Sequence, residues 1–161
     1  ACLNQVGWCY LESMTRHWAK ESKSTLTHVI SGSVVSSFRD TLCLSGEFKI
    51  FVPGYFYKAE LIEDTLHPEN SRAIGFIVKN DYLSNAEAQK SQCSIHEIEK
   101  LTGLDLFSAG THLEKPQLNK IESKIGDFTW EGYVSDCPEK TCDKVYNGRT
   151  KPGKRTKLRC K

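Results

Sequence analysis

The segment between Asn4 and Lys20 constrains the fold more than any other part of the sequence. Its apolar residues recur at four-residue intervals, at Val6, Tyr10, Met14 and Trp18. That spacing places them on one face of an α-helix, so we predict an amphipathic helix over residues 6–20. A helix with one apolar stripe is stable when the stripe is buried, and the rest of the chain must therefore supply a surface that covers it.

Four runs rich in β-branched and aromatic residues are expected to supply that surface as strands, at residues 26–35, 48–52, 55–62 and 73–78. Gly32 interrupts the first run, where we predict a bend, and Pro53-Gly54 marks a turn after the second. The last run is almost continuously apolar, which is typical of a buried central strand. Together the runs predict a central, mostly antiparallel sheet.

A second helix is predicted after Ser94, because Ser94 and Glu97 have the spacing of a capping box and Gly103 is placed to end the helix. A short helix is expected over residues 118–125, whereas residues 79–92 are polar and are expected to be exposed. With the first helix on one face of the sheet and the Ser94 helix on the other, the fold class is α+β.

Composition indicates one globular domain, with 39% hydrophobic and 26% charged residues among 161. No apolar run approaches the ~20 residues that span a bilayer, and no targeting peptide is recognisable at the start of the sequence. The charge is uneven, since residues 139–161 carry nine Lys or Arg and two acids, while the remainder carries 13 basic and 18 acidic side chains. A domain over residues 1–135 and a basic tail over 136–161 favour a polyanion such as nucleic acid as partner. A solubilising or cleavable tail is the alternative.

Cysteine is frequent and indicates an oxidising, extracellular compartment. The seven cysteines are Cys2, Cys9, Cys43, Cys93, Cys137, Cys142 and Cys160. None of them forms a pair with the two-residue spacing of a zinc knuckle, so disulfides in a secreted protein are the better interpretation. Because the count is odd, one thiol must stay free or reach another chain.

Four sequence blocks resemble the DNA/RNA non-specific endonucleases, the ββα-metal finger nucleases. Leu3-Asn4-Gln5 with Trp8 and Leu11-Glu12 is similar to the family's L-N-Q-x-x-W-x-x-L-E pattern. Residues 27–34 and 52–58 look like two of its strands. Residues 94–107, which include Leu101-Thr102-Gly103-Leu104-Asp105, resemble its I-E-x-L-T-G-L-D helix. The resemblance covers residues 3–107 and implies part of the ββα-metal nuclease fold.

The resemblance also implies roles for three residues in and just before the first helix. Asn4 would be the only direct protein ligand of a Mg²⁺ (or Mn²⁺) ion, Glu12 would accept hydrogen bonds from the water shell of the ion, and Arg16 would face the scissile phosphate. Glu12 and Arg16 are four residues apart, so they share a helix face and can orient one another. The alternatives without chemistry are a surface ion pair for these two and an ordinary N-cap for Asn4.

The general base of that family is a histidine in an R-G-H strand that precedes this helix. The histidines of the chain are His17, His28, His67, His96 and His112, and none lies in an R-G-H context. We therefore expect a partner chain, disulfide-linked or tightly associated, to carry the N-terminal part of the fold and to supply the histidine. The expected structure is a partial nuclease fold stabilised by disulfides.

Three functions stay open at this point. The chain is part of a secreted Mg²⁺-dependent, non-specific DNA/RNA endonuclease completed by a partner chain, or a catalytically inactive module that binds nucleic acid, or a structural or interaction subunit of a secreted complex. In the first two, phosphates would be held by basic residues of the tail, which are Arg149, Lys151, Lys154, Arg155, Lys157 and Arg159. Such contacts do not distinguish one base from another.

Overall fold

The computed structural model describes residues 7–20, 23–34, 41–43, 49–51, 53–80 and 83–126, with the backbone alone for residues 41–43 and 49–51. The predicted domain boundary at residue 135 and the basic tail lie outside these residues. In the described part, no helix is both long and apolar enough to cross a bilayer.

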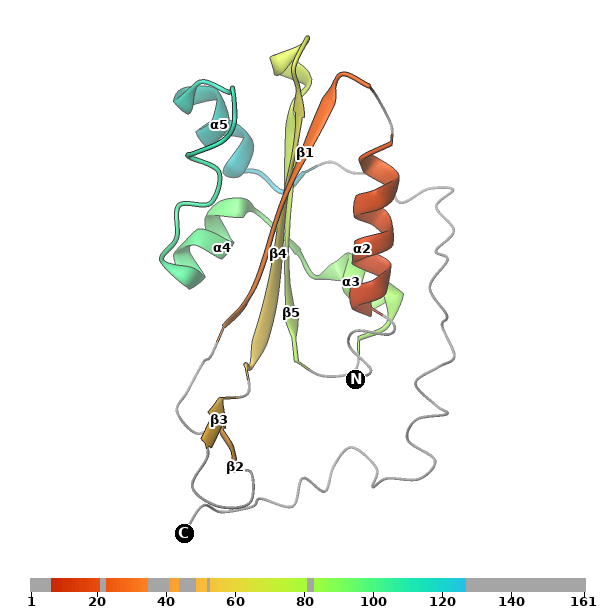
Figure 1. Cartoon of the computed structure of the whole chain (residues 1–161), viewed down its shortest axis with the longest axis vertical. Coiled ribbons are helices and arrows are strands. Elements are labelled where there is room, and N and C mark those ends of the chain that lie inside the picture. Colours follow the sequence, from red (N-terminus) through yellow and green to blue (C-terminus); the bar gives the residue numbers. More distant parts are fainter. Residues whose placement is uncertain are drawn as a thin grey trace.

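A four-stranded antiparallel sheet forms the centre of the fold (Figure 1). Its strands follow the order β1 (Thr25–Val34), β4 (Tyr55–Asp64), β5 (Arg72–Lys79) and β6 (Gln92–Cys93). The predicted run 48–52 does not join this sheet. Its described part, β3 (Lys49–Phe51), pairs with β2 (Thr41–Cys43) in a separate two-stranded sheet beyond the end of the central one. That prediction was wrong because strand periodicity does not identify the partner of a strand.

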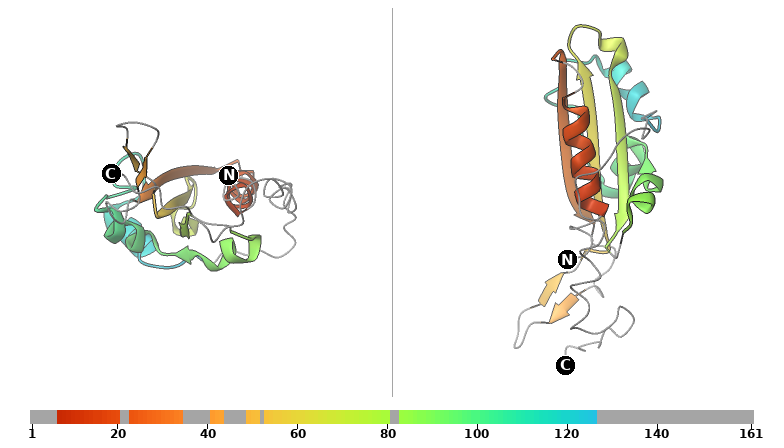
Figure 2. Two further views of the ribbon diagram at one scale, coloured as in Figure 1. Left: turned by 90° about the horizontal axis from the view of Figure 1, so that it is seen from below. Right: turned by 90° about the vertical axis from the view of Figure 1, so that its right-hand side faces the viewer.

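Helices cover both faces of the central sheet, which confirms the α+β class. α2 (Gly7–Trp18) and α3 (Asn85–Lys90) lie on one side in Figure 1, and α4 (Ile95–Thr102) and α5 (Lys115–Glu122) lie on the other. A 3₁₀ turn, η1 (Pro68–Asn70), lies in the connection between β4 and β5. Figure 2 shows α2 running alongside the long strands.

The apolar stripe of α2 is buried on the sheet, as the four-residue spacing predicts. Leu11, Met14 and Trp18 are at most 2% exposed and pack in one cluster with β5 residues such as Phe76. Burial of each such side chain stabilises the fold by about 1.5–3 kcal/mol. The opposite face of the sheet forms a second cluster, to which α4 contributes Ile98. The two clusters thus lie on opposite faces of the sheet.

Gly32 does not bend its strand, contrary to the prediction. β1 continues through Gly32, which is paired with Tyr57 of β4. A Cβ atom at this position would lie 2.5 Å from the Tyr57 ring, so a glycine is required for the close approach of that ring. The glycine therefore serves packing and not a change of chain direction.

Residues 79–92 are not simply exposed, because α3 forms within them. Ser84 and Glu87 make a complete capping box, and Leu83 and Ala88 are buried. The last predicted helix exists but is shifted: α5 spans Lys115–Glu122, with a proline in its first turn. The capping box of α4 and the left-handed Gly103 that ends it (φ 73°) confirm the prediction for that helix.

Two cysteine side chains are described. Cys9 on α2 is disulfide-bonded, and Cys93 on β6 is free and 7% exposed. Burial, followed by the charge of Glu97, raises the pKa of the Cys93 thiol to about 12. One free thiol leaves six other cysteines, so the odd count does not by itself require a bond to another chain. Stabilisation by disulfides stays a prediction.

Candidate functional site

The outward face of α2 carries the two candidate catalytic residues that the structure describes. Glu12 and Arg16 are both exposed, whereas Ser13 and Met14 between them, and Leu11 before them, are buried. They lie one helical turn apart on the solvent side of a helix whose other side is fixed to the sheet. A ligand that approaches this face can therefore contact a carboxylate and a guanidinium together.

The other candidate residues lie outside the described part of the chain. This holds for the predicted metal ligand Asn4 and for the predicted nucleic-acid contacts, which are Arg149, Lys151, Lys154, Arg155, Lys157 and Arg159. For these seven residues the assigned roles stay predictions.

A buried polar cluster lies beneath α2 and was not predicted from the sequence. Lys58 and Glu60 alternate on β4, are 4% and 0% exposed, and their Nζ and Oε1 atoms are 3.6 Å apart. The Lys58 Nζ atom lies 5.8 Å from the centroid of the Trp8 ring on the first turn of α2. Thr15, further along the helix, is hydrogen-bonded to Glu60 Oε1. The cluster therefore contacts α2 near both of its ends.

Thr15 has one hydroxyl proton but two acceptor neighbours. Its Oγ1 atom lies 2.9 Å from the Leu11 carbonyl oxygen, one helical turn away, and also contacts Glu60 Oε1. Burial raises the pKa of Glu60, against the hydrogen bond from Thr15 and the charge of Lys58. The single hydroxyl proton of Thr15 is therefore shared between the Leu11 carbonyl oxygen and Glu60 Oε1.

The cluster holds the helix that presents Glu12 and Arg16. Thr15 lies between those two exposed residues in sequence, and its side chain is tied to the central strand of the sheet. Sliding or rotating α2 would break this hydrogen bond and leave the buried Glu60 carboxyl without the Thr15 hydroxyl as a partner. In the sequence, Lys58 and Glu60 alternate with Tyr57, Ala59 and Leu61, which indicates a polar pair on one face of β4 but does not identify what covers it.

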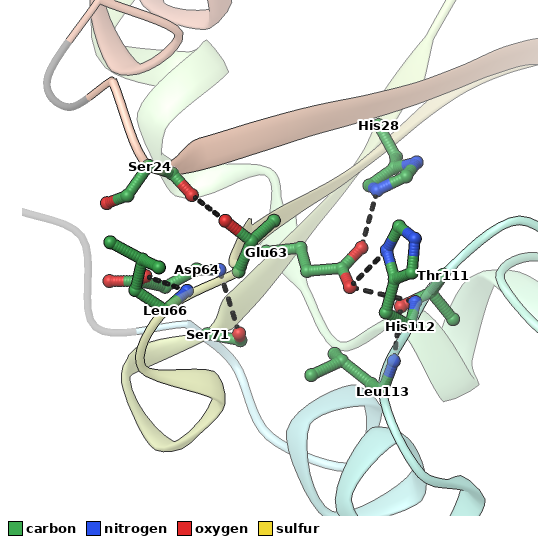
Figure 3. A network of polar contacts seen from close by, with 10 residues as sticks. Ser24, His28, Glu63, Asp64, Leu66, Ser71, Thr111, His112 and Leu113 are labelled. Atoms are coloured by element: carbon green, nitrogen blue, oxygen red, sulfur yellow. Dashed lines mark hydrogen bonds and ion pairs between the residues drawn. The ribbon is translucent and has the colours of Figure 1, made fainter.

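On the other face of the sheet, Glu63 is hydrogen-bonded to two of the five histidines, His28 and His112 (Figure 3). Its carboxylate is 2.8 Å from His28 Nε2, 3.1 Å from His112 Nδ1 and 2.8 Å from the backbone nitrogen of His112. Burial opposes the charged form of Glu63, but the backbone hydrogen bond from His112 and those from His28 and Thr111 outweigh it and lower the pKa. This network connects β1 and β4 to the segment that precedes α5.

None of the five histidines, all of which are described, faces Glu12 and Arg16 from the sheet. His28 and His112 contact Glu63 on the opposite face, and His96 lies there on α4. His67 precedes η1 and pairs with Glu69 at 3.4 Å. His17 is exposed on α2 itself, about 100° around the helix from Arg16. None of the five histidines is therefore placed on the sheet as a base opposite Glu12 and Arg16.

One further group has the composition of a metal site. His96, Glu99 and Glu122 each offer one ligand atom, and these three atoms lie within 4.8 Å of one another. Burial, followed by the charges of Glu99 and Asp105, raises the pKa of Glu122 to about 7. The group lies on the α4–α5 side and is separated from Glu12 and Arg16 by the sheet.

Comparison with known families identifies the chain. The family model of the DNA/RNA non-specific endonucleases matches residues 1–112, which includes α2, the whole central sheet and α4. Comparison with curated proteins gives no match. The members of this family are metal-dependent nucleases that typically use Mg²⁺. Since the match covers more than half of the 161 residues, the chain belongs to the DNA/RNA non-specific endonuclease family.

Proposed function

We propose that this chain is the metal-helix part of a secreted, Mg²⁺-dependent endonuclease that cleaves DNA and RNA without sequence preference. The observation that carries the proposal is the exposed Glu12–Arg16 pair on α2, the helix whose inner face is fixed by Thr15 and Glu60. Family membership supports phosphodiester hydrolysis as the reaction. The disulfide bond of Cys9 supports an oxidising compartment.

The donor atoms suit a hard cation. Asn4 would hold the ion through its amide oxygen, and the exposed carboxylate of Glu12 would accept hydrogen bonds from its water shell. A bound Mg²⁺ would supply charge stabilisation at the phosphate oxygens. Arg16 donates hydrogen bonds to a phosphate that approaches the same face, and its fixed charge stabilises the negative charge that develops during displacement. The basic tail would add sequence-independent phosphate contacts.

The general base belongs, in this proposal, to polypeptide outside residues 1–161. Two observations support this assignment. The five histidines lie away from the Glu12–Arg16 face or beside Arg16 on α2 itself, and β1 is an edge strand of the described sheet. Leu26 and Val29 of this strand are 44% and 42% exposed. A strand that carries the R-G-H histidine would add to this edge, either as a separate associated chain or as a segment joined to this one.

A second candidate function is binding of nucleic acid without cleavage. It is favoured by the same arrangement of histidines, because α2 alone offers a cation and an acid but no base opposite them. The two functions differ in their products. Binding alone predicts a salt-sensitive complex with intact nucleic acid, whereas the nuclease predicts Mg²⁺-dependent strand breaks.

A cleavage assay on the chain isolated under non-reducing conditions tests the proposal. Intact mass first identifies any polypeptide that accompanies it, and plasmid DNA and RNA are then incubated with the sample in Mg²⁺ and in chelator. We expect cleavage in Mg²⁺ by the species that contains the additional histidine strand. Intact substrate from that species would contradict the nuclease and leave binding as the function.

A further inference from the structure

Helices α4 and α5 bring three potential metal ligands together on the side of the sheet that α2 does not occupy. His96 and Glu99 lie one turn apart on α4, and Glu122 is the last residue of α5. His96 Nε2 is 3.9 Å from Glu99 Oε2 and 3.9 Å from Glu122 Oε2. A nitrogen and two carboxylate oxygens thus converge from two helices that are separate in sequence.

The Glu122 carboxylate provides an independent indication of a ligand at this group. Its side chain is only 4% exposed, and its buried Oε1 atom has no hydrogen-bond partner among the described residues. Burial of an unpaired carboxylate oxygen is unfavourable. Glu99 is different, because its Oε1 accepts a hydrogen bond from the Leu106 backbone nitrogen at 2.9 Å. That bond orients the Glu99 carboxylate and leaves Oε2 directed toward His96.

The three residues line a cavity with a volume of about 250 Å³. Asp105, Ser108 and Lys115 also line it, so its wall has polar groups beyond the three ligands. The cavity is large enough for a metal ion with water or a small anion beside it. Asp105 adds a third carboxylate to the wall, and a cation would reduce the repulsion among these charges.

We propose that His96, Glu99 and Glu122 form a binding site for a first-row transition metal ion, with Zn²⁺ as the preferred occupant. An imidazole with two carboxylates suits zinc and its neighbours, whereas Mg²⁺ prefers oxygen ligands and waters. Tetrahedral zinc places neighbouring ligand atoms about 3.3 Å apart, given bonds of about 2.0–2.2 Å. The two separations from His96 are 3.9 Å, and the three ligand atoms all lie within 4.8 Å of one another. Zinc binding therefore requires an inward movement of the 45% exposed His96 side chain and of the two carboxylates.

This site is independent of the proposed nuclease centre. The sheet and two separate apolar clusters lie between it and α2. Three protein ligands leave the fourth position open toward the cavity, where water or a small anion would complete the coordination. A metal here would also join the end of α5 to α4 and thus stabilise this side of the fold.

Zinc titration of the full chain after removal of metals with a chelator tests the site. Isothermal calorimetry with Zn²⁺ is expected to show a binding step. Substitution of a residue that only supports a metal ligand typically lowers metal affinity by about 10- to 100-fold. Because His96 and Glu122 are proposed as direct ligands, His96→Gln and Glu122→Gln are each expected to lower the zinc affinity by more than this. His96→Gln is the more informative variant because its exposed side chain is not needed for packing. Mg²⁺ is expected not to compete at equal concentration.

Two control variants distinguish this site from others. His67→Gln removes an exposed histidine that also lies near a glutamate, at 3.4 Å, and is expected to leave the zinc step unchanged. Asn4→Ala removes the proposed Mg²⁺ ligand and is likewise expected to leave it unchanged. Zinc binding that is absent, or that survives His96→Gln at full affinity, would overturn the proposal without bearing on the nuclease. Conversely, loss of the step in Asn4→Ala alone would assign the zinc to Asn4 and overturn the proposal as well.

Discussion

Thr15 of α2 and Glu60 of β4 are hydrogen-bonded across the interface between the helix and the sheet. Glu60 is fully buried, and Thr15 lies one residue before the exposed Arg16. This contact links the helix that exposes Glu12 and Arg16 to β4, whose residues 57–63 are all buried. The hydrogen bond fixes the position of α2 along the sheet. Apolar contacts alone would define that position less precisely.

Removal of the Thr15 hydroxyl is expected to destabilise the fold. Thr15→Val keeps the shape but leaves the Glu60 carboxyl without this partner, at a cost of about 1–3 kcal/mol in the free energy of unfolding. Urea denaturation followed by circular dichroism measures the change. Thr15→Ser retains the hydroxyl and is the matched control, for which we expect a much smaller loss. A loss in Thr15→Val no larger than that in Thr15→Ser would contradict the role assigned to the hydroxyl.

Stability at acidic pH is expected to depend on Glu63. Its pKa is lowered in the folded state, so the unfolded chain binds its proton more readily, and stability rises with pH across this range. The contribution of Glu63 is fully present above its ordinary value of 4.5 and is lost as the pH falls through the lower folded-state pKa. Hence the stability difference between the wild type and Glu63→Gln should shrink on acidification from pH 7.

Unfolding free energies of both proteins between pH 7 and pH 3 measure this dependence. Glu69→Gln serves as the control, because Glu69 is exposed and forms an ion pair with the exposed His67. We expect its difference from the wild type to be close to zero and independent of pH. A difference for Glu63→Gln that grows as the pH falls would contradict the assignment of a lowered pKa to Glu63.

Substitution of Gly103 is expected to destabilise α4 through the backbone alone. Gly103 has φ of 73°, and no atom lies within 4 Å of the position of a Cβ atom. Gly103→Ala should therefore cost about 1 kcal/mol, and Gly103→Asn should cost less because asparagine tolerates the left-handed region. Thermal unfolding of the three proteins gives the comparison. An alanine variant as stable as the wild type would mean that the helix end rearranges.

Local signals in the sequence predicted most elements of the fold. The four-residue spacing identified α2, and the Ser94–Glu97 box with Gly103 identified α4 and its end. The same capping signal, Ser84 with Glu87, marks the start of α3 within a stretch that its polar composition predicts to be exposed. These features depend on residues within one or two helical turns of each other, which is why they can be read without a structure.

Contacts between distant segments could not be predicted in this way. Lys58 and Glu60 read as ordinary polar strand residues until α2 is placed over them. His96 and Glu122 are 26 residues apart, and only the packing of α4 beside α5 brings them within 3.9 Å. Motif resemblance supplied Asn4, Glu12 and Arg16, which lie within or next to one short sequence block. No comparable sequence motif marks the Lys58–Glu60 pair or the His96–Glu122 pair.

The exposed carboxylate of α2 is expected to act in catalysis and not in folding. Glu12→Gln should leave the unfolding free energy within about 0.5 kcal/mol of the wild type, as is usual for surface substitutions. Its cleavage rate should fall because a neutral amide orients the water shell of the metal ion less strongly than a carboxylate does. Initial rates over a Mg²⁺ titration measure the loss, with the exposed Glu69→Gln as control. Equal rates for Glu12→Gln and the control would remove Glu12 from the site.

The most direct measurement for the central claim is the initial rate of plasmid cleavage by Arg16→Ala, in the species that cleaves DNA and at saturating Mg²⁺. Lys100→Ala is the matched control, since Arg16 and Lys100 are exposed basic residues in the last turns of α2 and α4, on opposite sides of the sheet. We predict a loss of about 10²- to 10³-fold for Arg16→Ala, which is typical for removal of one group that stabilises the transition state, and an unchanged rate for Lys100→Ala. Cleavage by Arg16→Ala at the rate of the control would contradict the assignment of the reaction to the exposed face of α2.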